Sequence, residues 1–175
     1  MWKLIIKMSL LNILYEGKVI GRNGKPLTIY KIRTMSLDAH EQEALVQKCN
    51  GIDELGKIVN DPRITSLGKL LRKYWIDEIP QIYNLCCGEL SLVGIRPRTV
   101  DKWKLFSDEH KEKALRYKPG LMGIHYAFPD IKNFNDFIEI DKIYLDEKDK
   151  FPILTDIKYF FRILYAILFK GVRSR

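Results

Sequence analysis

Two adjacent carboxylates, Asp77 and Glu78, are the residues of this sequence best placed to do chemistry. They follow the cations Arg72 and Lys73 and precede Pro80. Because proline lacks an amide hydrogen and crowds the preceding helical turn, a helix through this region should kink beside the two acids. Acids among cations at an irregular helix indicate a phosphate or metal site. The alternative is a solvated ion pair between Lys73 and Asp77, which contributes only about 0.2–0.5 kcal/mol.

A helix from Ser66 to about Gly88 should carry this acidic dyad (Asp77 and Glu78). Its apolar residues recur at the spacing of one helical stripe. They are Leu67, Leu70, Leu71, Tyr74 and Trp75. The cations occupy the other side of the helix, and Thr65 or Ser66 is suited to cap its first turn.

A β-hairpin is expected before this helix. Asn23–Gly24 is a hairpin-turn signal between the short strands Val19–Ile20 and Leu27–Tyr30. The second strand continues outward, and the two-residue period of a strand places Lys31 and Arg33 on one face.

The remaining segments complete an α+β fold that is mostly helical, with a small hairpin and short strands. Pro97 holds Arg96 and Arg98 on stiff backbone after a short extended segment at Glu89–Gly94. Helices are predicted at 37–49, 102–117, 136–148 and 156–170, and a loop at 122–135. The domain prediction is a short amphipathic segment at 1–14, followed by one domain at 15–175.

The composition favours an anionic partner. The 175 residues carry a net charge of +8, which suits nucleic acid, an anionic membrane or a phosphorylated substrate. No basic aromatic platform or recognition helix supports nucleic-acid binding. Three cysteines, an odd number without metal-ligand spacing, indicate a reducing compartment.

Both ends of the chain carry apolar residues mixed with cations. No stretch reaches the roughly 18 apolar residues of a membrane-spanning helix. The segment Met1–Leu14 suits an interfacial or docking helix. In the segment Ile157–Arg175, five cations and no acid accompany many Tyr, Phe, Ile and Leu residues, which is typical of a helix in the membrane interface. A helix packed across the domain explains the same pattern equally well.

Several ordered blocks resemble the bacterial sugar transferase family, the monotopic phosphoglycosyl transferases. Tyr30–Met35 resembles the family's "KFRTM" block, and the span Asn60–Pro97 matches its central signature almost position for position. Tyr117–Gly123 resembles its "RPGITG" block. Two further blocks, at 141–144 and 155–158, resemble its C-terminal region.

The resemblance implies a reaction. Such enzymes transfer a sugar 1-phosphate from a nucleotide sugar, usually a UDP-sugar, to polyprenyl phosphate, and this step begins lipid-linked glycan synthesis. Carried over, Asp77 is the nucleophile that forms an aspartyl-phosphosugar, Glu78 helps to place Mg²⁺, and Lys73 helps to keep Asp77 ionised. The dyad (Asp77 and Glu78) is thereby both catalytic and metal-binding.

The resemblance also implies substrate-binding residues and a location. The predicted set is Lys31, Arg33, Arg72, Arg96, Arg98 and Asp141. The three histidines, His40, His110 and His125, share no metal spacing and are expected to have no catalytic role. The expected location is the cytoplasmic face of the bacterial inner membrane, peripheral or monotopic. A homo-oligomer or a complex with partner glycosyltransferases is left open.

Three features depart from the family pattern. Few residues precede Tyr15, where the family carries a long apolar segment. Ile95 stands where the family has a proline. The run Met122–Pro129 replaces the family's "TGLAQV.GR", so the polar Thr and Gln of that run are absent. The second hypothesis is therefore a non-catalytic family member that binds a nucleotide sugar or a partner transferase.

Overall fold

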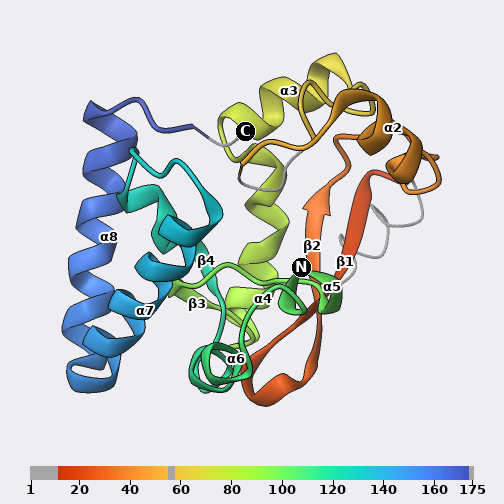
Figure 1. Ribbon diagram of the computed structural model, residues 1–175. Coiled ribbons are helices and arrows are strands. Elements are labelled where there is room, and N and C mark those ends of the chain that lie inside the picture. Colours follow the sequence, from red (N-terminus) through yellow and green to blue (C-terminus); the bar gives the residue numbers. More distant parts are fainter. Residues whose placement is uncertain (1–11, 55–57, 174–175) are drawn as a thin grey trace.

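The computed structural model describes residues 12–54 and 58–173. The structure contains two small sheets, a β-hairpin and a second two-stranded sheet, and the second sheet lies between the hairpin at one side and the C-terminal helix Pro152–Phe169 at the other (Figure 1). The strands are β1 (Leu14–Ile20), β2 (Pro26–Ile32), β3 (Ser91–Gly94) and β4 (Gly120–Gly123). The α-helices are α2 (Glu43–Asn50), α3 (Ser66–Lys73), α4 (Ile82–Cys86), α5 (Val100–Trp103), α6 (Asp108–Leu115), α7 (Phe134–Lys150) and α8 (Pro152–Phe169). Three 3₁₀-helices are η1 (Arg22–Gly24), η2 (Ile76–Gln81) and η3 (Ile124–Ala127). The α+β prediction is confirmed.

The predicted hairpin is present. Strands β1 and β2 pair antiparallel, with Leu14 opposite Ile32 and Gly17 opposite Ile29. The turn contains Asn23 at φ 57° and Gly24 at φ 73°, the left-handed region that these two residue types adopt most readily.

The sequence did not predict that the second sheet forms, because the pairing of its two strands was not foreseen. Strands β3 and β4 are parallel, and Val93 lies opposite Met122. Their backbones approach so closely that a Cβ on Gly120 would lie 2.1 Å from the amide nitrogen of Gly94. The loop predicted for 122–135 is therefore wrong at both ends, because Met122 and Gly123 belong to β4 and α7 already begins at Phe134. The 3₁₀-helix η3 also lies inside the predicted loop. A strand of four residues is too short for the alternation of apolar and polar side chains to be recognised in the sequence.

The helix before the dyad ends earlier than predicted. Helix α3 stops at Lys73, and Trp75 adopts φ 57°, a left-handed conformation. The break therefore lies at Trp75 and not at Pro80. Pro80 sits inside η2, where its fixed φ suits the 3₁₀ backbone.

Other helix boundaries also shift. The helix predicted from residue 37 begins only at Glu43, after a series of turns. The helix predicted at 102–117 is two helices, because Ser107 caps a new helix by accepting a hydrogen bond from the His110 amide. Pro152 starts α8, at a position where a missing amide hydrogen costs nothing.

Helix α8 packs across the domain with one face, as one of the two sequence interpretations predicted, and contact of its other face with a membrane stays a prediction. Tyr159, Ile163 and Ala166 are buried against the core, which includes Tyr144 of α7. The opposite face of α8 is exposed and apolar. Its residues are Ile153, Leu154, Ile157, Phe161, Tyr165, Leu168 and Phe169. Within residues 12–54 and 58–173, no helix is both long and apolar enough to cross a membrane. Most of the predicted segment 1–14 lies outside the described residues.

Candidate active site

The acidic dyad lies on η2 and is buried between this helix and strand β2. Asp77 is 5% exposed and Glu78 is 7% exposed. The left-handed turn at Trp75 redirects the chain after α3, so both carboxylates face the protein rather than solvent. The alternative of a solvated pair with Lys73 is wrong, because Asp77 is buried while Lys73 is exposed, with its ammonium 5.5 Å from the Tyr74 ring centre.

Glu78 is held by two cations from different elements. Its Oε1 accepts a hydrogen bond from Lys31 Nζ of β2 at 3.2 Å and another from Arg96, which follows β3. Burial alone would raise the pKa of Glu78, but Arg96 and Lys31 outweigh it and lower that pKa. Glu78 is therefore a charged anchor that brings the two cations together.

The pKa of Asp77 is shifted in the opposite direction to that of Glu78. Burial raises the pKa of its carboxyl, and Glu78 adds to this, while Lys31 and Arg72 work in the other direction. Its Oδ1 is buried and has no hydrogen-bond partner within the described part of the chain. Asp77 is thus a buried, under-satisfied acceptor beside cations, which is an environment that favours binding of a cation or reaction with an electrophile.

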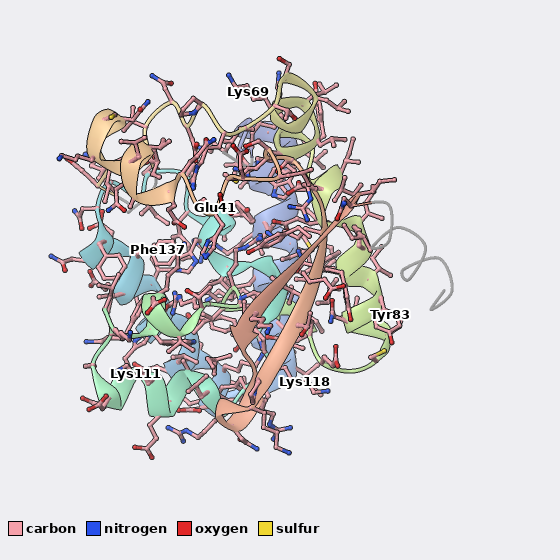
Figure 2. The ribbon with its side chains drawn as sticks, turned by 90° about the vertical axis from the view of Figure 1, so that its right-hand side faces the viewer. Glu41, Lys69, Tyr83, Lys111, Lys118 and Phe137 are labelled. Atoms are coloured by element: carbon pink, nitrogen blue, oxygen red, sulfur yellow. The ribbon has the colours of Figure 1, made fainter. Side chains whose placement is uncertain are left out.

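Helix α3 carries Arg72, and Gly68 lets this helix pack close enough to Thr34 for Arg72 to reach the site. A Cβ on Gly68 would lie 2.1 Å from the Thr34 carbonyl oxygen, so only glycine lets α3 approach this closely. One turn later, Arg72 Nε donates to Thr34 Oγ1 at 2.9 Å. The predicted apolar stripe of α3 faces solvent instead: Leu67, Leu70 and Tyr74 are each more than half exposed. Lys69 also extends outward from this helix (Figure 2).

Arg96 contacts both the dyad and a residue that the sequence did not single out. It donates to Glu78 and, through Nη1, to Tyr126 Oη at 3.1 Å. Burial opposes the charged form, but Tyr126 and Glu78 raise the pKa of Arg96. A Cβ on Gly123 would lie 2.4 Å from Arg96 Cγ, so this glycine leaves room for the arginine.

Arg98 and Asp141 lie in a separate, closed cluster. Arg98 Nη2 donates to Asp141 Oδ2 at 2.6 Å, and the side chains are 6% and 0% exposed. His110 Nε2 lies 3.1 Å from Asp141 Oδ2, and His125 Nε2 lies 3.0 Å from Oδ1. The aromatic rings of Phe106 and others cover the guanidinium. Substrate binding by Arg98 and Asp141 stays a prediction, and their burial favours a structural role.

Arg33 is directed away from the dyad. Its Nε donates to the Asn12 carbonyl oxygen at 3.0 Å, and its Nη2 donates to that of Leu14 at 3.3 Å. These bonds tie the start of β1 to the end of β2. A substrate-binding role for Arg33 also stays a prediction, and its hydrogen bonds favour a structural role.

Tyr126 is the residue beside the dyad that sequence reasoning missed. His110 and His125 belong to the closed cluster, and the prediction that they have no catalytic role stays a prediction. The two histidines are 15 residues apart and meet only because both reach Asp141. Tyr126 lies in the run that departs from the family pattern, and that departure was the one available signal.

The dyad fits a Mg²⁺ ion bound partly by substrate. In the part of the chain that the structure describes, Asp77 Oδ1 has no hydrogen-bond partner, and a carboxylate oxygen is the hard ligand that Mg²⁺ prefers. No cluster of three metal-binding side chains occurs among the residues described. Mg²⁺ in phosphoryl-transfer sites is usually held by one or two carboxylates, with substrate phosphates and water. Glu78 fits less well, because its Oε1 is already taken by Lys31 and Arg96.

Comparisons with known proteins identify the class. Residues 1–170 match the bacterial sugar transferase family, and the chain belongs to that family. It is 38% identical over 158 residues to the galactosyl transferase CpsE of Streptococcus agalactiae, covering 89% of this chain and 34% of that protein. It is 31% identical over 162 residues to the undecaprenyl-phosphate galactose phosphotransferase of Salmonella typhimurium, covering 89% of this chain and 33% of that one.

A shorter relative matches over more of its length. The exopolysaccharide production protein ExoY of Sinorhizobium fredii is 32% identical over 163 residues, which cover 89% of this chain and 70% of ExoY. The chain thus spans about a third of the length of CpsE and of the Salmonella protein.

Proposed function

We propose that this chain transfers a sugar 1-phosphate from a UDP-sugar to polyprenyl phosphate, with Asp77 as the nucleophile. The observation that supports this most is the buried Asp77 carboxylate beside the cations Lys31 and Arg72, because its Oδ1 has no hydrogen-bond partner among residues 12–54 and 58–173. The relatives named for galactosyl or galactose-phosphate transfer make galactose the first sugar to test.

The reaction proceeds in two displacements. An Asp77 oxygen attacks the sugar-bearing β-phosphorus, the bond from that phosphorus to the bridging oxygen breaks, and UMP leaves with the electron pair. An oxygen of polyprenyl phosphate then attacks the same phosphorus and releases Asp77 as a free carboxylate. A carboxylate nucleophile divides one difficult transfer into two easier ones.

The cations around the dyad have distinct tasks. Arg72 and the guanidinium hydrogens of Arg96 not used by Glu78 and Tyr126 bind the donor's phosphate oxygens, since a planar guanidinium matches that geometry. Glu78 keeps Lys31 and Arg96 in place. Bound Mg²⁺, held by Asp77 with Glu78 close by, would neutralise charge on the phosphoryl oxygens.

Two exposed apolar faces fit contact with a membrane, where the lipid acceptor resides. One is the outer face of α3 with Leu67, Leu70 and Tyr74, and the other is the outer face of α8. Cations lie beside both, as expected for attraction to anionic lipids. We place the protein at the cytoplasmic face of the bacterial inner membrane, in agreement with its three free cysteines.

Vesicle binding tests this placement. We expect Phe161→Ser, on the outer face of α8, to weaken binding to phosphatidylglycerol vesicles about tenfold, because a buried aromatic side chain contributes about 1.5–3 kcal/mol. Val100→Ser, at an exposed apolar position of α5, is the matched control. Equal binding by both variants would contradict the assignment of α8.

Release of UMP tests the reaction. The purified chain, incubated with UDP-galactose and other UDP-sugars, Mg²⁺ and undecaprenyl phosphate, should release UMP with at least one donor. Asp77→Asn should abolish that release. Binding of UDP-sugars without any turnover would instead support the non-catalytic alternative.

A further inference from the structure

We propose that Tyr126 is a positioning residue that holds Arg96 against Glu78 and fixes the turn that carries the dyad. This inference rests on the proposed function, because it assigns Tyr126 a task in that reaction. Tyr126 lies on η3, and both of its targets come from other parts of the chain.

The first contact is with the arginine. Tyr126 Oη accepts a hydrogen bond from Arg96 Nη1 at 3.1 Å, and the guanidinium carbon lies 5.6 Å from the centre of the ring. Arg96 Nη2 donates to Glu78. The guanidinium is thus held at both Nη atoms, and rotation about its Nε–Cζ bond would break both hydrogen bonds.

The second contact is with the turn before the dyad. The rings of Tyr126 and Trp75 meet edge to face, with centres 5.4 Å apart and planes at 86°. Trp75 has the left-handed φ of 57°, which L residues seldom adopt unless their surroundings impose it. The Tyr126 ring therefore packs on the residue whose conformation directs Asp77 and Glu78 inward.

Helix η3 is itself firmly anchored. The neighbouring His125 is buried, lies 3.0 Å from Asp141 Oδ1 and stacks on Phe137. Consecutive residues of η3 thus serve two sites: His125 joins the closed Arg98–Asp141 cluster, and Tyr126 reaches the dyad.

A double-mutant cycle on UMP release tests the proposal. We expect Tyr126→Phe, which keeps the ring and removes the hydroxyl, to lower kcat about tenfold with little change in KM. In an Arg96→Lys background the same change should have less than a twofold effect, because the interaction is already lost. Tyr117→Phe, which removes a hydroxyl bonded to Asp149 at the surface, is the control and should leave kcat unchanged.

A second readout does not depend on turnover. In the nitrogen-15 spectrum of the folded protein, the Arg96 Nη signals, assigned with Arg96→Lys, should be distinct in the wild type. In Tyr126→Phe the two Nη chemical shifts should average to one, because the guanidinium loses a hydrogen bond and rotates more freely about its Nε–Cζ bond. Unchanged Nη signals, or equal effects of Tyr126→Phe in both backgrounds, would overturn the positioning role. A wild-type chain that releases no UMP from any donor would contradict the proposed function, and the spectra would still decide the role of Tyr126.

Discussion

Two carboxylate–arginine clusters draw their arginines, Arg96 and Arg98, from the same loop after β3, and the clusters differ in how exposed their cations are. Arg96 joins Glu78 in the dyad cluster, where the Arg96 and Lys31 side chains are 24% and 26% exposed. Arg98 joins Asp141 in the closed cluster, where both side chains are almost fully buried. Both clusters contain a buried polar atom without a hydrogen-bond partner among the described residues, Asp77 Oδ1 in one and Arg98 Nη1 in the other. The cations of the dyad cluster are accessible, whereas two histidines and aromatic rings enclose the Arg98–Asp141 pair. Accessible cations beside an unpartnered acid can bind a ligand, and an enclosed ion pair stabilises the fold.

The largest effect on stability should come from breaking the enclosed pair. Arg98→Ala leaves Asp141 buried without its main cation, and removal of one partner of a buried pair costs about 3–5 kcal/mol. Chemical denaturation should show this loss, while Lys31→Met, at a more exposed pair, should cost much less. Similar losses for both variants would remove the distinction between the two clusters.

Substitution of Arg96 should lower activity much more than stability, the reverse of what we expect for Arg98. Loss of a cation that stabilises charge in the transition state typically lowers kcat by about 10²–10³. Arg96→Ala should therefore reduce UMP release by about that factor while the protein stays folded, since Lys31 still pairs with Glu78. If Arg96→Ala instead unfolds the protein with activity preserved in the folded fraction, Arg96 belongs with the structural residues.

Asp77→Asn should make the protein more stable as it inactivates it. Burial raises the pKa of Asp77 in the folded state, so folding favours the protonated acid, and this contribution is lost as the pH rises through the folded pKa. The neutral amide escapes that penalty. We expect a gain of about 1 kcal/mol at pH 7 that disappears below about pH 4. Denaturation midpoints at both pH values provide the measurement, and a loss at pH 7 would contradict this prediction.

The smallest effect should come from Lys73, which the sequence placed one helical turn before Asp77. Because Lys73 is exposed and lies over Tyr74, Lys73→Met should change the free energy of unfolding by less than about 0.5 kcal/mol. UMP release should change less than twofold. A large fall in activity would restore the predicted pairing of Lys73 with Asp77.

The hairpin could be predicted from a short stretch of sequence, because the turn residues Asn23 and Gly24 are adjacent. The acidic dyad could be selected as a candidate site in the same way, because the block around Asp77 is contiguous in sequence. The left-handed conformation of Trp75 could not be read in this way, and the Trp75 ring packs against Tyr126, which lies far along the chain. The Arg98–Asp141 pair joins residues 43 positions apart. Motifs therefore identified chemically capable residues, and only tertiary packing separated the accessible cluster from the enclosed one.

The most direct test is the covalent intermediate. The chain is incubated with Mg²⁺ and a UDP-sugar that supports UMP release, without polyprenyl phosphate, and its intact mass and peptides are then measured. We predict an added sugar phosphate on the peptide that contains Asp77, absent in Asp77→Asn and removed by polyprenyl phosphate. UMP release by an active wild-type protein with no adduct, or with an adduct on the Asp141 peptide, would contradict the assignment of Asp77 as the nucleophile.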